Sequence, residues 1–391
     1  MLGAMRWVTG GVLVFACALA GGCDSKEDAP DAAASDASTV IDGLADRQID
    51  VTAGQDAVAV PEGATDAAGP DAGGVPLSCG PGTVQVGATC LPGVEPVATT
   101  ETFTYRSITS NDGGGVFFLD QDRLAVHRFD LTSKTFQMPL TLEMAPSAIA
   151  ADASGTTLFL AFIGGRIDAL DLASGARAFF AAAPDTVATM LVLERHLLTI
   201  DPSGGWSTRS LFDLTSKQRV FSDDGSYPSE QPIYADRIKT VISQSDQVSP
   251  TDLFVSQYDP AAQTLSRSVD SPYHGNYRLG YPMRLTPSQD RLVTSSGLIF
   301  TTSKLEYVGS IGFAYVDLQF QGDRLYLLER DTTTPGPRAP TRLKVLDAAF
   351  NVLETVIIQG APIRLFVHGT ELVVLVRGSD GKLGHHTRRL P

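Results

Sequence analysis

The chain has 391 residues, with 30 basic and 44 acidic side chains and a net charge of −14. This charge argues against a nucleic-acid backbone as the main partner, because such binding needs a positive surface, although it leaves room for a local basic patch. The length suits two or three ordinary domains or one large repeat domain. No nucleophile elbow, zinc-protease motif or phosphate-binding glycine loop is present, so motifs assign no reaction.

Residues 1–22 are predicted to be an export signal. Arg6 precedes an apolar stretch, Val8 to Ala20, that is too short to span a membrane comfortably but suits a signal peptide. Small residues then lead to Cys23 in a pattern that resembles the bacterial lipobox, although Leu19 lies four residues before the cysteine instead of three. The resemblance implies cleavage before Cys23 and lipidation of its sulfur. The alternatives are ordinary secretory cleavage, which would leave a free thiol, and a retained signal anchor.

Residues 23–76 are predicted to form a disordered tether. They hold 12 acidic and two basic residues, so their charge is 2 − 12 = −10, and they contain no Phe, Tyr, Trp or Met. Such a segment cannot bury enough apolar surface to offset the entropy of ordering. We expect it to act as a spacer between a lipid surface and the domain that follows.

Residues 77–94 are predicted to be a small module stapled by a disulfide between Cys79 and Cys90. These are the two cysteines left after signal cleavage and lipidation, and pairing is typical of an oxidising compartment. Two unpaired thiols are the alternative. No metal is expected here, because two thiolates without a nearby histidine cannot complete a zinc shell.

Residues 95–391 carry short β-rich runs in place of helical patterns, and one strand-to-turn pattern recurs along them. In five copies an aspartate stands at the start of the turn, and in one further copy Phe300 is assigned to that position. The steps between these six positions are 41, 42, 46, 41 and 47 residues. This spacing is typical of a β-propeller blade, and the span predicts seven blades of four antiparallel strands, with six or eight as alternatives. The recurring acidic positions are Asp130, Asp171, Asp213, Asp259 and Asp347.

The recurring aspartates are interpreted as structural rather than catalytic residues. A short acidic side chain at the start of a turn can accept a hydrogen bond from a backbone N–H two residues on, which closes the turn. At the start of the domain, the strand-like run Thr99–Tyr105 is expected to complete the last blade and so remove an open sheet edge.

The repeats are similar to the broad bacterial propeller group with WD-type and YVTN-type repeats. The tether and the cysteine module resemble those of bacterial surface lipoproteins. These resemblances imply a lipid-anchored protein of the bacterial cell envelope, on the periplasmic face or the cell surface, with the membrane contacted through Cys23. The function expected is a binding or scaffold role without catalysis or cofactor, toward an envelope protein or a glycan.

Two loops are candidate binding sites. The first contains Tyr273, His274, Asn276 and Tyr277, and the second contains Arg330 and Asp331. Among the other histidines, His127 and His196 are expected to pack, and His385 and His386 are adjacent on a strand and so face opposite ways. The alternative function is a propeller hydrolase or lyase with a polar or metal site in the central channel.

Overall fold

The computed structural model describes residues 79–80, 82–86, 89–203, 206–226, 229–245, 251–330 and 339–391, all within the unit Gly73–Pro391. The predicted signal at 1–22, the lipidation site Cys23 and the tether at 23–76 lie outside them. Every regular element in the described part is a β-strand, and none of it forms a helix that could cross a membrane.

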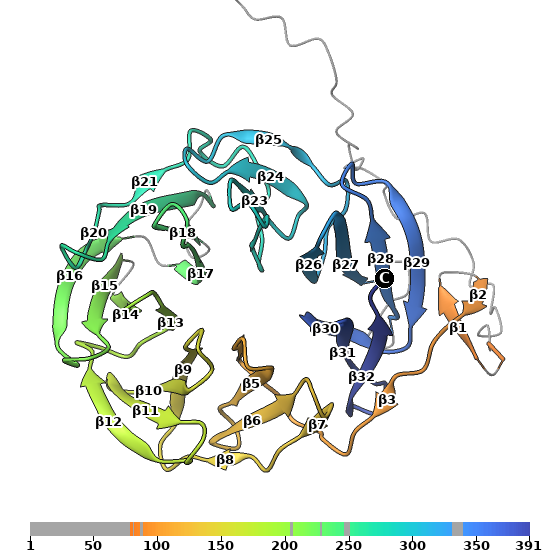
Figure 1. The fold of residues 1–391 in the computed structure, drawn as a ribbon, viewed down its shortest axis with the longest axis horizontal. Coiled ribbons are helices and arrows are strands. Elements are labelled where there is room, and N and C mark those ends of the chain that lie inside the picture. Colours follow the sequence, from red (N-terminus) through yellow and green to blue (C-terminus); the bar gives the residue numbers. More distant parts are fainter. Residues whose placement is uncertain are drawn as a thin grey trace, which may run out of the picture. The chain divides into compact units, whose positions relative to one another are not determined.

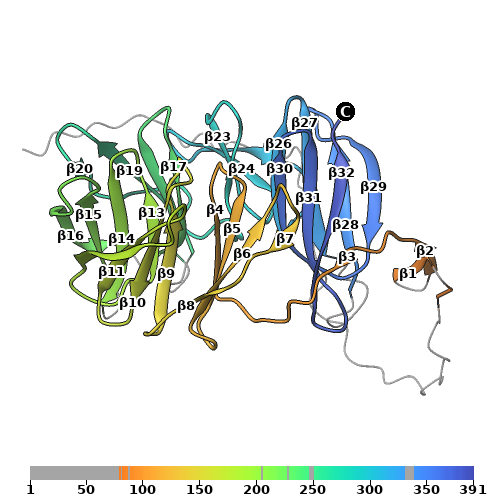
Figure 2. The same ribbon diagram turned by 60° about the horizontal axis from the view of Figure 1, so that its bottom comes forward.

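In the described part of the chain, seven antiparallel sheets are arranged side by side in a closed ring (Figures 1 and 2). This arrangement confirms the predicted all-β propeller with seven blades of four strands. In the first six blades the chain begins at the innermost strand and moves outward.

The strands of the first three blades are as follows. Blade 1 has β4 (Ser107–Ser110), β5 (Gly115–Asp120), β6 (Ala125–Asp130) and an outer strand divided into β7 (Thr135–Phe136) and β8 (Leu140–Thr141). Blade 2 has β9 (Pro146–Ala151), β10 (Thr157–Phe162), β11 (Arg166–Asp171) and β12 (Arg177–Ala182). Blade 3 has β13 (Thr189–Val192), β14 (His196–Ser203), β15 (Trp206–Asp213) and β16 (Arg219–Ser226).

The next three blades follow the same plan. Blade 4 has β17 (Ser229–Ala235), β18 (Thr240–Ser245), β19 (Leu253–Asp259) and a divided outer strand, β20 (Thr264–Leu265) and β21 (Val269–Asp270). Blade 5 has β22 (Arg284–Leu285), β23 (Arg291–Val293), β24 (Leu298–Thr301) and β25 (Tyr307–Ser310). Blade 6 has β26 (Asp317–Gln321), β27 (Arg324–Arg330), β28 (Thr341–Leu346) and β29 (Val352–Ile358).

Blade 7 closes the ring with strands from both ends of the domain. It contains β30 (Ala361–His368), β31 (Glu371–Arg377) and β32 (Leu383–Arg389), and its outer strand is β3 (Val97–Ala98). Val97 pairs with His385 and Ala98 with Gly384. Closure by a strand from the start of the domain was therefore predicted correctly, but the residues were wrong: the strand is Val97–Ala98 and ends before the expected run Thr99–Tyr105.

The chain leaves the sheet soon after this strand. The Thr99 N–H donates to the Leu383 carbonyl at 2.9 Å, and the Leu383 N–H donates to the Glu101 carbonyl at 2.9 Å. Phe103 then packs, fully buried, in the apolar cluster between blades 7 and 1. The burial of this ring explains why the expected run does not continue as a strand, because an aromatic side chain gains more between the blades than at the sheet edge.

The hydrophobic core consists of seven clusters, one at each interface between neighbouring blades. Adjacent residues on one strand contribute to different interfaces. Phe117 packs toward blade 2 and Phe118 toward blade 7. Because both faces of each blade are buried, second strands such as β10 and β31 are continuous apolar runs rather than alternating ones.

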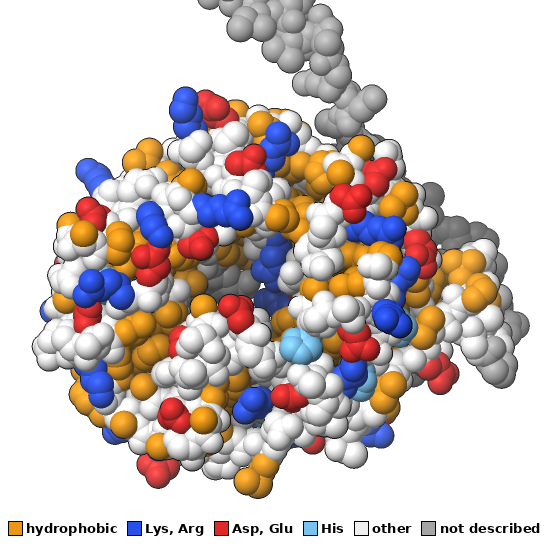
Figure 3. Space-filling view, in the orientation of Figure 1, with side chains coloured by type: hydrophobic (Ala, Val, Ile, Leu, Met, Phe, Trp, Pro, Cys, Tyr) orange, Lys and Arg blue, Asp and Glu red, His pale blue; other side chains and the backbone are white. Residues whose placement is uncertain are grey.

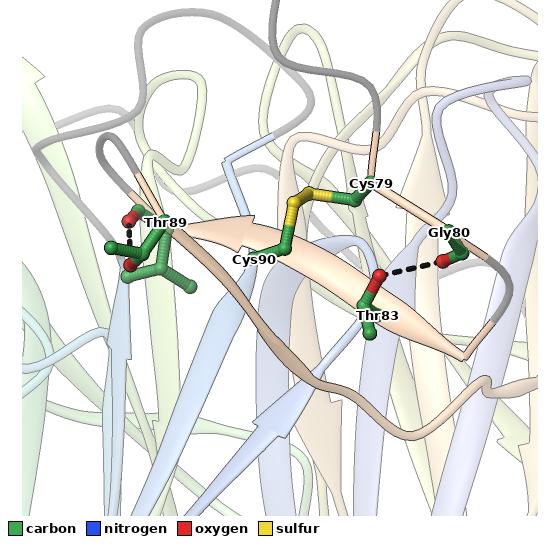
Figure 4. Close-up of a disulfide and its surroundings, with 6 residues drawn as sticks. Cys79, Gly80, Thr83, Thr89 and Cys90 are labelled. Atoms are coloured by element: carbon green, nitrogen blue, oxygen red, sulfur yellow. Dashed lines mark hydrogen bonds between the residues drawn. A yellow bond between two sulfur atoms is a disulfide. The ribbon is translucent and has the colours of Figure 1, made fainter.

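The small module before the ring is a hairpin of β1 (Thr83–Val86) and β2 (Thr89–Pro92). The disulfide between Cys79 and Cys90 is confirmed (Figure 4). Thr83 Oγ1 donates to the Gly80 carbonyl at 2.6 Å in the turn that the disulfide closes. The Val94 N–H donates to the Ile357 carbonyl at 2.8 Å, so the segment after the hairpin contacts the outer strand of blade 6.

The five recurring aspartates lie where a third strand ends, and their carboxylates accept hydrogen bonds from backbone N–H groups of the following turn. These donors are Thr132 and Ser133 for Asp130, Ser174 for Asp171, Thr215 and Ser216 for Asp213, Ala261 and Ala262 for Asp259, and Ala349 and Asn351 for Asp347. The carboxylate thus satisfies turn donors that the sheet leaves without partners.

The assignment of Phe300 to this repeated position is wrong by one residue. Phe300 is buried, and Thr301 ends β24. The Leu305 N–H donates to the Thr301 carbonyl at 3.0 Å, as the Lys134 N–H donates to the Asp130 carbonyl at 2.8 Å. Threonine supplies the acceptor here, since its Oγ1 accepts from the Glu306 N–H at 3.0 Å.

The stretch Ser222–Gln231, which looks like a polar loop in the sequence, is mostly strand. Ser226 ends β16 and Ser229 begins β17. Asp223 and Asp224 have side-chain partners on the neighbouring strand β15. Arg209 forms an ion pair with Asp223, and Thr208 Oγ1 donates to Asp224 at 2.8 Å.

Asp213 offers a test of the turn. The Ser216 N–H, together with the Arg195 guanidinium, lowers the pKa of Asp213 to about 2. Because this value is below that of an unfolded aspartate, the stabilisation is complete above the unfolded pKa and is lost as the pH falls through about 2. We predict that Asp213→Ala lowers the free energy of unfolding by about 1–2 kcal/mol near neutral pH, measured by urea denaturation.

The difference in free energy of unfolding between wild type and Asp213→Ala should shrink as the pH falls from about 5 to about 2.5. Asp112→Ala, at an exposed turn position, is the matched control. A difference in free energy of unfolding between wild type and Asp213→Ala that does not change with pH would contradict this account of the turn.

Candidate functional site

The blade topology separates the recurring turns from the predicted binding loops. Successive strands of a blade are antiparallel, so turns from first to second and from third to fourth strands lie on one face of the ring. Turns from second to third strands, and connections between blades, lie on the other. The recurring aspartates therefore occupy one face, and the loops after Asp270 and after Arg330 belong to the other.

The loop between β21 and β22 is tied down at its base by Asp252. This carboxylate is almost fully buried and accepts hydrogen bonds from the Ser271 hydroxyl and from the Leu253 N–H. Its second oxygen lies 3.5 Å from Nδ1 of His274, whose side chain is 75% exposed. The imidazole of His274 is therefore exposed to solvent on a loop whose first residues are held in place by Asp252.

The two tyrosines of this loop pack rather than project. Tyr273 and Tyr277 meet edge to face at 5.0 Å between ring centroids, and Tyr277 stacks on Tyr307 at 4.8 Å. The Tyr273 hydroxyl accepts a hydrogen bond from the Tyr307 N–H at 3.1 Å. Of the four predicted contact residues, His274 and Asn276 are exposed, and the tyrosines form the half-buried platform beneath them.

The second predicted loop is described only at its start. Arg330 is the last residue of β27, is exposed and pairs in register with Thr341. Asp331 lies outside the described residues.

The central channel contains a cavity of about 320 Å³ that the sequence did not locate. Its wall comes from the innermost segments of all seven blades, and most of it is apolar or carries hydroxyl and amide groups. Arg284 of blade 5 and Arg364 of blade 7 are the charged side chains of this wall. Figure 3 shows Lys and Arg side chains in the hollow at the centre of the ring.

Asp317, at the start of β26, lies between these arginines from neighbouring blades. The Arg284 Nη2 donates to Asp317 Oδ1 at 2.5 Å, and Arg364 Nη1 lies 3.9 Å from the same oxygen. The N–H groups of Leu318 and Leu365 also donate to this carboxylate, at 2.9 and 2.8 Å. Asp317 therefore holds three blades together beside the channel.

The remaining histidines mostly take part in packing. His127 is buried, stacks on Phe103 at 3.6 Å and lies 3.2 Å from Asp120. His196 is buried, with Nδ1 2.5 Å from the Tyr258 hydroxyl. Over the described ranges, no group of three or more His, Cys, Asp or Glu side chains is arranged to hold a metal ion.

The comparisons with known proteins show no family for this chain. No protein-family model matches the chain, and no curated protein matches it. Among solved structures, the chain is similar to Kuenenia stuttgartiensis hydrazine synthase, with 12% identity, a TM-score of 0.43, and coverage of 71% of this chain and 75% of that one.

The role of Asp252 can be tested by hydrogen exchange. We predict that Asp252→Ala speeds amide exchange across residues 271–277, because the Ser271 hydroxyl loses its acceptor and the loop base is released. Asp270→Ala, an exposed neighbour on β21, is the matched control and should leave exchange unchanged. Equal protection of the loop in the Asp252 variant and the wild type would show that the carboxylate does not fix it.

Proposed function

We propose that the chain is a lipid-anchored, extracytoplasmic binding or scaffold protein of the bacterial cell envelope that acts without catalysis. Its propeller presents one face to an envelope protein or glycan. The observation that carries this proposal is the loop after β21, where His274 and Asn276 are exposed above a base fixed by Asp252 and a tyrosine platform. A loop ordered before binding loses less entropy when the partner arrives.

The disulfide supports the proposed location. Structural disulfides persist in oxidising compartments and are rare in the cytosol. The bond between Cys79 and Cys90 lies just after the proposed tether, and so agrees with export of the chain and with an anchor at Cys23.

The channel supports binding better than hydrolysis or elimination. A general base needs a carboxylate oxygen that can reach the substrate proton. Asp317 is fully buried and accepts from Arg284, Leu318 and Leu365, so its oxygens are already engaged.

Lipidation at Cys23 can be tested directly. We predict that the protein incorporates a radiolabelled or alkyne-tagged fatty acid in its native host and partitions with membranes. Cys23→Ser should lose both the label and the membrane partition. A Cys23→Ser protein that keeps its fatty acid label would contradict the anchor.

Partner binding can be tested by quantitative mass spectrometry after mild crosslinking of the full-length protein in its own membrane. We predict a stoichiometric partner that is lost with Cys23→Ser, which removes the anchor, and with the double variant His274→Ala and Asn276→Ala. The matched control is Thr215→Ala with Gln218→Ala, two exposed positions at a turn on the opposite face. Recovery of the same partner with the loop variant would exclude this loop as the binding surface.

A further inference from the structure

We propose that the central channel is a binding site for a small molecule carrying an oxyanion group, either a carboxylate or a phosphate. Arg364 contacts the anion, and Arg284 with Asp317 positions it. This inference goes beyond the proposed function and does not rest on it, because the channel and the loop after β21 use different residues.

The first support is the charge balance of the site. Asp317 is one carboxylate shared by two arginines, and its closest ionic partner is Arg284 at 2.5 Å. With two backbone N–H groups also donating to it, this carboxylate has little capacity left for Arg364. Two guanidiniums against one carboxylate leave the cluster of Arg284, Asp317 and Arg364 with a net charge of +1, and both guanidiniums line the cavity.

The second support is the unused hydrogen-bonding capacity of Arg364. A guanidinium has five donors in a planar fork, and a donor removed from water without an acceptor is costly. The Arg364 side chain is 17% exposed, and its 3.9 Å separation from Asp317 Oδ1 is too long for a hydrogen bond. Among the described residues, none accepts a hydrogen bond from this guanidinium.

Burial of the Arg364 guanidinium also favours the binding of an anion. Desolvation, with Arg284 nearby, lowers the pKa of Arg364, although Asp317 opposes this effect. A bound carboxylate or phosphate would place two oxygens opposite the fork, which is the geometry that such groups share with arginine. The same arrangement disfavours a cation, because it would meet uncompensated positive charge.

The third support is a second polar group on the same wall. Ser107, on the inner strand of blade 1, lines the cavity, and its hydroxyl is buried without a hydrogen-bond partner among the described residues. Thr109 and Gln319 add further polar groups, and Ile108 and Phe366 supply apolar surface. A cavity of about 320 Å³ suits a small organic anion rather than a polymer.

The test is calorimetric titration of the full-length protein in detergent with inorganic phosphate, succinate and citrate in separate experiments. Sodium chloride at matched ionic strength is the control for screening. We expect saturable binding of at least one anion and none of chloride. Stronger binding of phosphate than of the carboxylates would identify a phosphate ligand, and the reverse a carboxylate ligand.

Variants assign the site. Arg364→Gln should weaken binding at least about 10-fold, and Arg364→Lys should restore part of it, because a lysine keeps the charge but not the fork. Arg388→Gln is the matched control, since Arg388 is bound to Glu354 outside the channel and carries the same charge change. If Arg364→Gln fails to fold, Ser107→Ala should weaken binding several-fold in its place.

Two results would overturn the proposal. One is the absence of saturable anion binding in the wild-type protein. The other is equal affinity in wild type and in a folded Arg364→Gln variant. Neither result would affect capture of a partner through the loop after β21, so failure of this proposal and failure of the proposed function can be told apart.

Discussion

The structure depends on the burial of each blade on both of its faces. Phe117 and Phe118 are neighbours on β5, yet one packs toward blade 2 and the other toward blade 7. An open array of such blades would leave two apolar faces in water, so the array is stable only as a closed ring.

The ring is closed by a short strand pairing, in which Val97 and Ala98 pair with β32. The burial of Phe103 between the first and last blades reinforces this pairing. Gly384 allows this approach, because a Cβ there would lie 3.1 Å from the Val97 carbonyl oxygen.

The closed ring also creates the chemistry of the channel. Arg284, Asp317 and Arg364 begin or lie on the inner strands of three consecutive blades, and no local pattern links them. Packing of those blades brings two guanidiniums to one carboxylate, and no described residue accepts a hydrogen bond from the guanidinium of Arg364. Charge beside a narrow, largely apolar cavity is screened less than charge at the surface. The excess positive charge of the two guanidiniums over the one carboxylate therefore favours an anion in the cavity. The loop after β21 is a separate feature of one face, and the two can act independently.

The sequence predicted features set by local chemistry and missed features set by closure. The five aspartates are visible as a period because every third-strand turn needs an acceptor for its backbone N–H groups. The copy at Thr301 was misplaced because a threonine supplies that acceptor and the buried Phe300 took its place in the alignment. The closing strand is only two residues long, too short for any pattern, and the channel arginines lie 80 residues apart on strands with no shared motif. In the loop after β21, the sequence proposed four contact residues together but could not separate exposed His274 from packed Tyr277.

The most direct test of this account is the location of an anion in the ring. A crystal of the protein soaked in selenate, recorded at the selenium absorption edge, would show bound anion by its anomalous scattering. The account predicts a peak inside the channel within hydrogen-bonding distance of the Arg364 guanidinium, with Asp317 still held by Arg284. An empty channel, or selenate bound only at arginines on the outer surface, would contradict the claim that ring closure creates an anion site.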